Sequence, residues 1–474
     1  MSRQGSLIKN TLIFSIGTVL PKFSVFITSP ILTGCLTKNE YGMFDLIFTV
    51  FSMALPVATL NIHAASFRYL IDARGNPDET KSIISSTVIF SSSISAAALV
   101  PLFFMIPGNP AVRLLSCVYL FVSLSNTITG LFTRGVGRNL DYSLSAVVNV
   151  SFKVLFIVVF LWWFNAGLTG AVAAILLSSA SSMMFLILRT GIFRYVSLSS
   201  LSLGRIRQLI SYSFPNLLDA MCWWVINASD RIIVSSFLGL PANAAYAVAH
   251  KIPGLLNLAQ STFGLAWSEN ASLAMKDNDR AEYYTQMFRA LLDFMAGLLG
   301  LIIASTPILF AVLIKGDYSD AYTQMPLLFM ASFFSIICSF LGGIYMACKE
   351  MKGLARTTFM AAACNVTANL VLIKFIGLYA ASLSTVISYV LVGTVRMRDV
   401  REMAGMKYDV MHMILVVAFL SLMAVLCCVR NIFLDIINII MSAAFFTVLN
   451  KGMILAVRRK LSARFTRKKS GQPS

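Results

Sequence analysis

Charged side chains are scarce in this sequence. Asp, Glu, Lys and Arg together make up 12% of the 474 residues, whereas hydrophobic residues make up 58%. Soluble chains average about 25% charged residues, and here long apolar runs recur along the whole chain. This composition excludes a large water-soluble domain. It predicts an all-α integral membrane protein, because helices satisfy their own backbone hydrogen bonds in lipid.

The motifs of the common enzyme classes are missing as well. The sequence contains no P-loop, no nucleophile elbow, no HExxH helix and no dinucleotide-binding glycine pattern. Its three histidines are scattered, and its eight cysteines lie in or beside apolar segments without paired spacing. We therefore predict that the protein is not an enzyme and has no disulfide framework, metal site or cofactor. Coupling to H+ or Na+ stays open.

Acidic residues are fewer than basic ones, and the chain carries a net charge of +18. In a membrane protein, a concentration of Lys and Arg in cytoplasmic loops explains such an excess better than nucleic acid binding does. We therefore predict no nucleic acid partner. A bilayer-spanning helix needs about twenty apolar residues. We place fourteen such segments, at 10–36, 42–66, 82–106, 111–133, 142–164, 166–188, 211–238, 243–267, 290–314, 325–348, 356–376, 378–397, 410–429 and 432–456.

The positions of Lys and Arg orient these segments. Basic residues gather in the N-terminal tail, in the connections after even-numbered segments and in the C-terminal tail, whereas the other connections carry about one each. We therefore predict that both termini are cytoplasmic. Four basic residues lie more than five positions from either end of a predicted span, namely Lys22, Lys153, Arg231 and Lys251.

Two internal echoes suggest a duplicated unit of six helices. Tyr41 and Tyr246 follow the first and seventh spans in similar sequences, and Asn149-Val150 precedes a Gly-Leu pair much as Asn365-Val366 does. A parallel repeat of this kind places a substrate site between two lobes. The predicted organisation is an N-terminal lobe at 1–190, a cytoplasmic linker at 191–210, a C-terminal lobe at 211–400, two added helices at 401–457 and a basic cytoplasmic tail at 458–474.

Several ordered motifs carry a resemblance to a known family. They are Leu7-Ile8-Lys9-Asn10-Thr11, Leu36 to Gly42 with Asp45, Arg134 to Arg138, Phe214-Pro215 with Ser229-Asp230-Arg231, and Ala244-Ala245-Tyr246 with Lys251-Ile252. Through these motifs, the chain resembles the polysaccharide (O-antigen type) flippases of the multidrug/oligosaccharidyl-lipid/polysaccharide exporter superfamily. The resemblance extends over nearly all of residues 7–400. One departure is Ala245, where the common pattern has glycine.

The resemblance implies a substrate and a mechanism. Flippases of this family move undecaprenyl-pyrophosphate-linked oligosaccharide repeat units across the bacterial cytoplasmic (inner) membrane, for O-antigen, capsule or exopolysaccharide biosynthesis. It implies two six-helix lobes around a central cavity that opens alternately to each side, with two further C-terminal helices. The expected partners are the lipid-linked oligosaccharide, the lipid bilayer and the polysaccharide polymerase machinery.

The four basic residues inside the spans are our candidates for binding the substrate headgroup. Charges cost roughly 2.5–3.5 kcal/mol each at the centre of a membrane helix, so they persist where a cavity or a partner compensates them. A pyrophosphate would gain charge-assisted hydrogen bonds from Lys22, Lys153, Arg231 and Lys251. The alternatives are that Lys22 contacts carbonyl groups freed by Pro21, and that Arg231 and Lys251 lie at the membrane surface. Pro215 and Pro253 are predicted to interrupt the seventh and eighth helices.

The acidic residues and the cytoplasmic arginines have two interpretations each. Asp45, Asp219 and Asp230 are candidates for a gate or a coupling-ion site, because a buried carboxylate can load and release a proton. Alternatively, Asp230 forms a static pair with Arg231, and Asp45 lies at the interface. The arginines at the cytoplasmic ends of helices either make the first contact with the headgroup or anchor the protein, namely Arg68, Arg134 and Arg138.

Two other functions compete with a flippase. A multidrug exporter of the same superfamily would carry organic cations, and the basic residues inside the spans argue against such cargo. A polysaccharide polymerase typically carries a large external loop, whereas the predicted outer loops are all short.

Overall fold

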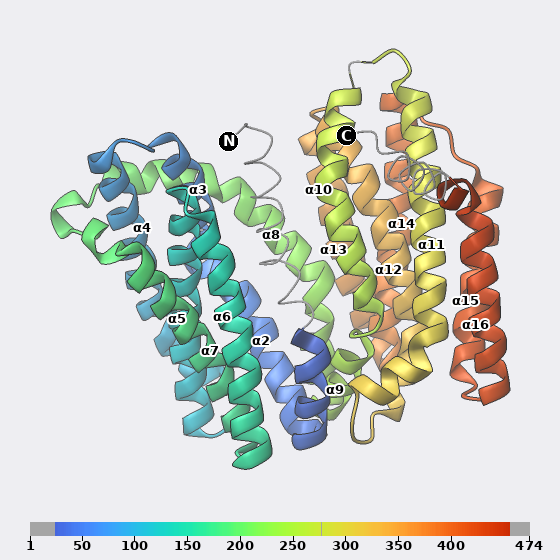
Figure 1. Ribbon diagram of the computed structural model, residues 1–474, viewed down its shortest axis with the longest axis horizontal. Coiled ribbons are helices and arrows are strands. Elements are labelled where there is room, and N and C mark those ends of the chain that lie inside the picture. Colours follow the sequence, from blue (N-terminus) through green and yellow to red (C-terminus); the bar gives the residue numbers. More distant parts are fainter. Residues whose placement is uncertain (1–23, 276, 456–474) are drawn as a thin grey trace, which may run out of the picture. The chain divides into compact units, whose positions relative to one another are not determined.

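The computed structural model describes residues 24–275 and 277–455, and every regular element among them is a helix (Figure 1). The predicted all-α membrane fold is therefore confirmed. Eleven of the helices are long and apolar enough to cross a membrane. They are α2 (Lys38–Ala58), α4 (Pro77–Met105), α5 (Pro110–Gly135), α6 (Asn139–Ile157) with its π-helical extension (Val158–Trp163), α7 (Gly167–Thr190), α11 (Arg280–Leu313), α12 (Ser319–Ala347), α13 (Met351–Ile376), α14 (Tyr379–Ala404), α15 (Val410–Cys428) and α16 (Ile432–Leu449).

The other three predicted spans, the first, seventh and eighth, do not each correspond to one apolar helix of spanning length. The first is described only from residue 24, as the short apolar helix Ser24–Cys35. The seventh lies in α8 (Leu203–Leu238), which continues through Pro215; the predicted interruption there is wrong, because a helix can tolerate one missing N–H. The eighth is broken as predicted, into α9 (Leu240–Ala249) and α10 (Leu256–Ala274), with Pro253 starting a 3-10 turn between them.

The second predicted span is also divided. α2 contains Pro56 and ends at Ala58, and α3 (Ile62–Asp72) begins after two residues with positive φ, Leu60 and Asn61. Proline removes a backbone donor from the helix, and left-handed residues end its course. His63 and Arg68 therefore belong to a short separate helix.

The described chain forms two compact units, each with its own core. Of the described residues, the first comprises 24–247 and 312–318, and the second comprises 248–275, 277–311 and 319–455. α8 packs against α2, α3 and α4, so the first unit extends past the predicted linker at 191–210. The predicted domain limits mark a sequence duplication that packing does not test, and they stay a prediction.

In the first unit, α7 packs against both α5 and α6. Asn76 and Asn109 cap α4 and α5 by accepting hydrogen bonds from backbone N–H groups, each followed by a proline at the first helical turn. Residues 312–318 pack near the start of α2, where Lys38 pairs with Asp317 at 3.2 Å.

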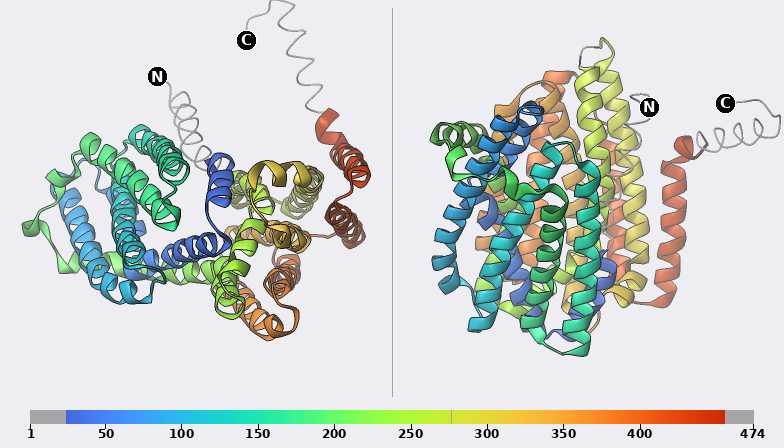
Figure 2. Two further views of the ribbon diagram at one scale, coloured as in Figure 1. Left: turned by 90° about the horizontal axis from the view of Figure 1, so that it is seen from below. Right: turned by 60° about the vertical axis from the view of Figure 1, so that its left-hand side comes forward.

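In the second unit, α14 packs against both α12 and α13, and α15 packs against α12 and α16. The order of contacts among α12, α13 and α14 repeats that of α5, α6 and α7. The helices of each unit run roughly side by side, which is seen in the end-on view of Figure 2.

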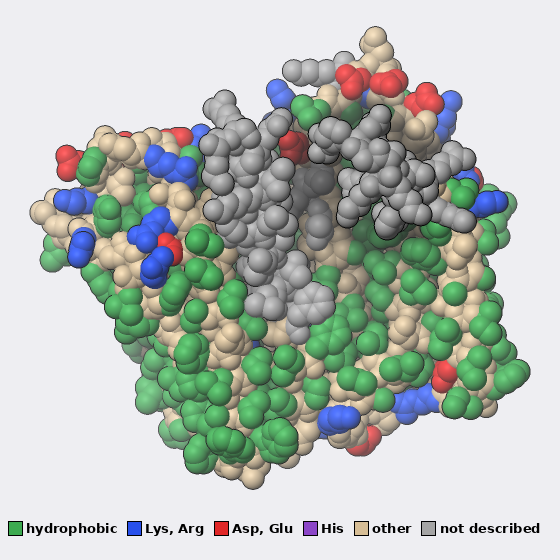
Figure 3. All heavy atoms as spheres, in the orientation of Figure 1, with side chains coloured by type: hydrophobic (Ala, Val, Ile, Leu, Met, Phe, Trp, Pro, Cys, Tyr) green, Lys and Arg blue, Asp and Glu red, His purple; other side chains and the backbone are tan. Residues whose placement is uncertain are grey.

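The surface of each unit is that of a membrane protein. On the face shown in Figure 3, hydrophobic side chains cover the middle of the helices, and Lys, Arg, Asp and Glu gather toward their ends. Large apolar side chains such as Phe104, Leu188 and Phe375 are exposed there or on other faces. In a bilayer, lipid covers such residues.

Candidate functional site

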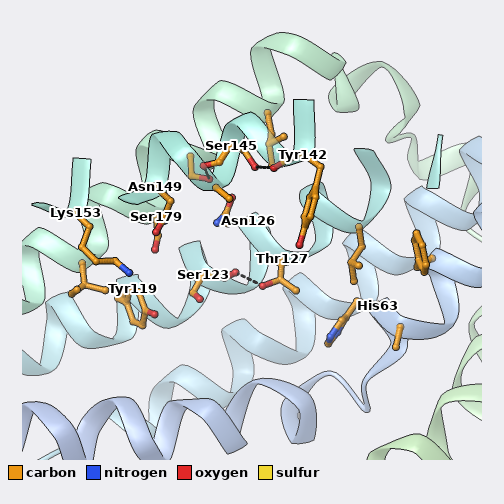
Figure 4. A pocket seen from close by; sticks show the side chains of 18 residues that line it. His63, Tyr119, Ser123, Asn126, Thr127, Tyr142, Ser145, Asn149, Lys153 and Ser179 are labelled. Atoms are coloured by element: carbon orange, nitrogen blue, oxygen red, sulfur yellow. Dashed lines mark hydrogen bonds between the residues drawn. The ribbon is translucent and has the colours of Figure 1, made fainter. Parts of the chain in front are cut away.

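The first unit contains a polar cavity of about 580 Å³ between α3, α5, α6 and α7. Figure 4 shows the 18 residues that line it. More than half of them carry a polar group, and most of these belong to helices that are otherwise apolar. The labelled polar residues are His63, Tyr119, Ser123, Asn126, Thr127, Tyr142, Ser145, Asn149, Lys153 and Ser179.

Helical periodicity places these side chains on common faces. On α6, Tyr142, Ser145, Asn149 and Lys153 recur every three or four residues, so they share one side of the helix. α5 supplies a similar row from Tyr119, and α7 contributes Ser179 and Ser182. Each helix thus turns an apolar face to lipid or core and a polar face to the cavity.

A glycine permits the close approach of α5 and α6 at one end of the cavity. A β-carbon at Gly130 would lie 3.2 Å from the ring of Tyr142, closer than ordinary van der Waals contact. The Tyr142 ring therefore packs directly on the α5 backbone, and it forms part of the cavity wall.

The electrostatics of the cavity are set by one lysine. Lys153 is the sole Lys, Arg, Asp or Glu among the lining residues, so no carboxylate faces it there. Among the described residues, no side chain pairs with or hydrogen-bonds to its ammonium group. The carboxamide oxygen Oδ1 of Asn126 is buried and accepts no hydrogen bond. The Lys153 ammonium can thus bind an anionic group of a ligand, and the Asn126 oxygen can accept a hydrogen bond from one of its hydroxyls.

His63 lines the cavity from α3, and its Nδ1 lies 3.5 Å from Thr59 Oγ1. The ring projects into the cavity in Figure 4, so it belongs to the polar part of the wall.

The predicted headgroup arginines lie near one end of the cavity. The guanidinium carbon of Arg134 is 4.7 Å from the ring centre of Phe67 and 5.2 Å from that of Tyr142, and both rings line the cavity. Arg138 donates to Asp141 at 2.7 Å, and Arg68 pairs with Asp72. Arg134 is therefore the one of the three that touches the cavity wall.

The predicted acidic and basic residues of α2 and α8 form a separate cluster. Arg231 Nη1 donates to Asp45 Oδ1 at 2.9 Å and to Thr49 Oγ1 at 3.1 Å. The amide of Asn243 donates to the other Asp45 oxygen at 3.3 Å, and Tyr246 donates to the buried Asp230 at 2.9 Å. Asp45 therefore joins two helices of the first unit through Arg231.

The remaining predicted site residues are placed as follows. Lys251 lies in the second unit, in the turn after α9, where its N–H donates to the carbonyl of Val248 at 3.0 Å. Lys22 lies outside the described residues, and so does the side chain of Asp219, whose backbone belongs to α8.

The structure brings some of these residues together and keeps others apart. Lys153 lines the cavity with Arg134 beside it, whereas Arg231 and Asp45 are not among the lining residues. Asn126, Asn149, Tyr119 and Tyr142 form much of the wall and were not predicted as site residues. The signal was present, because these polar residues follow helical spacing within apolar helices.

The comparisons with known proteins identify the family. Residues 7–267, more than half of the chain, match the family described as "Polysaccharide biosynthesis protein". The chain belongs to this family. No curated protein matches the chain in a sequence search.

Solved structures establish the fold. An inward-facing multidrug resistance MATE family transporter of the MOP superfamily matches with a TM-score of 0.68 and 14% identity, over 83% of this chain and 97% of the other. The lipid II flippase MurJ, in an inward closed conformation, matches with a TM-score of 0.67 and 13% identity, over 95% and 99%. A MOP superfamily transporter from Pyrococcus furiosus, noted for a binding pocket of reverse polarity, matches with a TM-score of 0.57 and 13% identity, over 83% and 94%.

These matches confirm the predicted family and fold. The chain is a multi-pass membrane protein of the polysaccharide biosynthesis family, and it has the fold shared by MOP superfamily transporters and flippases.

Proposed function

We propose that this protein is a flippase for an undecaprenyl-pyrophosphate-linked oligosaccharide repeat unit in the bacterial cytoplasmic membrane. The product would supply O-antigen, capsule or exopolysaccharide synthesis, with a polymerase acting next. The observation that carries the proposal is the polar cavity whose single charged lining residue is Lys153. A cation surrounded by neutral hydrogen-bonding groups suits an anionic, hydroxyl-rich headgroup.

The same observation argues against the competing cargo. A multidrug exporter of organic cations would have to hold a positive charge near Lys153 without a facing carboxylate, and like charges repel strongly where water is scarce. The cavity is therefore better suited to an anion.

Transport would proceed by alternating access. The headgroup would enter the cavity from the cytoplasmic side, while the polyprenyl tail stays in the bilayer, and rocking of the lobes would expose the headgroup to the outer side. Lys153 and Arg134 are our first choices for headgroup contact. Lys22, Arg231 and Lys251 stay candidates, and Asp45, Asp219 and Asp230 stay candidates for a gate or for H+ or Na+ coupling.

Complementation tests this function. The full chain is expressed in a bacterium that lacks its own repeat-unit flippase, and surface polysaccharide is measured at matched membrane abundance. We expect wild type to restore the polymer and Lys153→Met to reduce it at least about tenfold, the loss typical of removing a charged hydrogen-bond partner. Lys374→Met, which removes an exposed lysine from α13, is the matched control and should retain full function.

Each outcome bears on the proposal. Restoration by wild type and Lys374→Met but not by Lys153→Met supports a flippase with an anion-binding cavity. Equal restoration by both variants would remove Lys153 from the site. Failure of the wild type in hosts that make several different repeat units, combined with drug efflux, would overturn the flippase function.

A further inference from the structure

Two basic residues lie in or beside the cavity, one toward each end. Tyr142 and Lys153 lie on the same face of α6, eleven positions apart, which corresponds to about 16 Å along a helix that rises 1.5 Å per residue. Arg134 lies against the Tyr142 ring, at one end, and Lys153 lies toward the other. A single pyrophosphate group is too short to contact both.

The stretch between these ends carries neutral hydrogen-bonding groups. Ser123, Asn126 and Thr127 of α5 face Asn149 of α6 and Ser179 of α7 across the cavity (Figure 4). Hydroxyl and carboxamide groups can both donate and accept, which matches the hydroxyls of a sugar ring. The buried oxygen of Asn126 has no donor among the described residues and would accept from such a hydroxyl.

The direction from which the lipid-linked substrate enters determines which end of the cavity binds the pyrophosphate. The lipid tail holds the pyrophosphate at the headgroup level of the bilayer, and Arg134 lies in the last turn of α5, at the predicted cytoplasmic end. Lys153 lies in the second half of α6, among the apolar residues of its span. A headgroup that enters from this end therefore places its sugars, and not its pyrophosphate, beside Lys153.

Building on the flippase function proposed above, we propose that the cavity is a sugar subsite and that Lys153 selects a repeat unit bearing a negatively charged substituent on a sugar. The substituent is a carboxylate or a phosphate, since a lysine ammonium is a flexible point charge that accepts either geometry. Lys153 is thus a specificity-determining residue, and Arg134 contributes to binding of the pyrophosphate that all repeat units share.

Binding measurements on the purified full chain in lipid nanodiscs test this assignment. The probes are three short-chain polyprenyl-pyrophosphate disaccharides that differ in the second sugar, which is glucose, glucuronic acid or glucose 6-phosphate. We expect wild type to bind at least one acidic probe about tenfold more tightly than the glucose probe. Lys153→Met should weaken binding of the preferred acidic probe far more than binding of the glucose probe, so that the ratio falls to near one, and Lys153→Arg should restore the preference.

The two acidic probes distinguish a carboxylate from a phosphate as the recognised group. Arg134→Gln is the matched comparison and should weaken binding of all three probes by a similar factor. Equal loss for all probes in Lys153→Met would overturn the specificity role, because Lys153 would then contact the pyrophosphate or support the fold. Binding of all three probes by wild type without preference would overturn the inference and leave the flippase function standing, whereas binding of none would overturn both.

Discussion

The three-helix sets α5–α7 and α12–α14 have the same packing order and different interiors. In each set, the third helix packs against the other two. The first set helps to enclose the 580 Å³ cavity along the middle of its helices, whereas the middle of α12 carries large buried apolar side chains, among them Phe329, Phe333 and Phe340. The pocket of about 330 Å³ in the second set lies at the helix ends, beside Tyr345, Arg356 and Asp399. In the apolar stretch of α5, 39% of residues are buried, against 72% in α12. A repeated packing order therefore does not imply a repeated site.

Single positions show how the two sets diverged. Asn149 lines the cavity, whereas its sequence echo Asn365 is fully buried and donates to Thr385 at 3.2 Å. The same offset, 365 − 149 = 216 residues, pairs Lys153 with the buried Asn369. The second set thus uses polar groups to join helices, and the first set leaves them available to a ligand.

The two sets also differ in how they hold a basic side chain. In the second set, the buried Arg396 donates to Thr357, Thr358 and the carbonyl of Cys338 at 2.9–3.0 Å. Those bonds fix the guanidinium between α12, α13 and α14, which is a structural role. Lys153 has no such bonds among the described residues. This difference is why we propose the first set, and not the second, as the substrate site.

Filling the cavity should give the largest effect. Ser179→Phe places an aromatic ring in the cavity and makes the first set resemble the second, so we expect flipping in proteoliposomes to fall to the protein-free background. Leu177→Phe, an outward-facing change on the same helix, is the control and should transport normally. Normal transport by Ser179→Phe would mean that the substrate does not use this cavity.

Truncation of a buried aromatic side chain in α12–α14 should lower the stability of the protein more than it changes transport specificity. Phe333 of α12 is 1% exposed, and truncation to Ala should cost about 3–5 kcal/mol of unfolding free energy. Phe359→Ala, at a position of α13 that is 67% exposed, should change it by about 0.5 kcal/mol or less. Denaturant unfolding in detergent measures both, and equal effects would contradict a filled interior in α12–α14.

The Asp45–Arg231 pair should give the smallest effect of the three. A double-mutant cycle with Asp45→Asn and Arg231→Met should show a coupling of about 0.5–3 kcal/mol, since both side chains are mostly buried and bond directly at 2.9 Å. The exposed Arg68–Asp72 pair, tested with the equivalent substitutions, should show about 0.5 kcal/mol or less. Coupling of equal size in the two pairs would show that burial adds nothing to the α2–α8 contact.

Much of the fold could be predicted from the sequence because the bilayer imposes it. Apolar runs of sufficient length give the spans, and Pro253 marks the break in the eighth. The division between α2 and α3 was missed, because left-handed residues such as Asn61 give no apolar signal. The effect of Pro215 on the seventh helix was overestimated, since α8 stays helical on both sides of it.

The candidate site was predictable only in part. Lys153 stood out as a charge within an apolar span, and Arg134 as part of a motif. That Arg231 pairs with Asp45 depends on residues 186 positions apart, which no local pattern reveals. The helical spacing of the polar residues around Asn126 and Asn149 can be read from the sequence. Only the packing of α5 and α6 shows that these two polar faces meet around a cavity.

Reconstituted transport tests the central claim most directly. Wild type, Lys153→Met and Lys374→Met are inserted into liposomes with a fluorescent polyprenyl-pyrophosphate oligosaccharide bearing a glucuronic acid, and the rate at which the headgroup becomes accessible to an external quencher is measured. We predict rapid flipping by wild type and Lys374→Met, and a rate at least about tenfold lower for Lys153→Met. Equal rates for all three proteins would contradict the claim that the cation in the α5–α7 cavity binds the substrate.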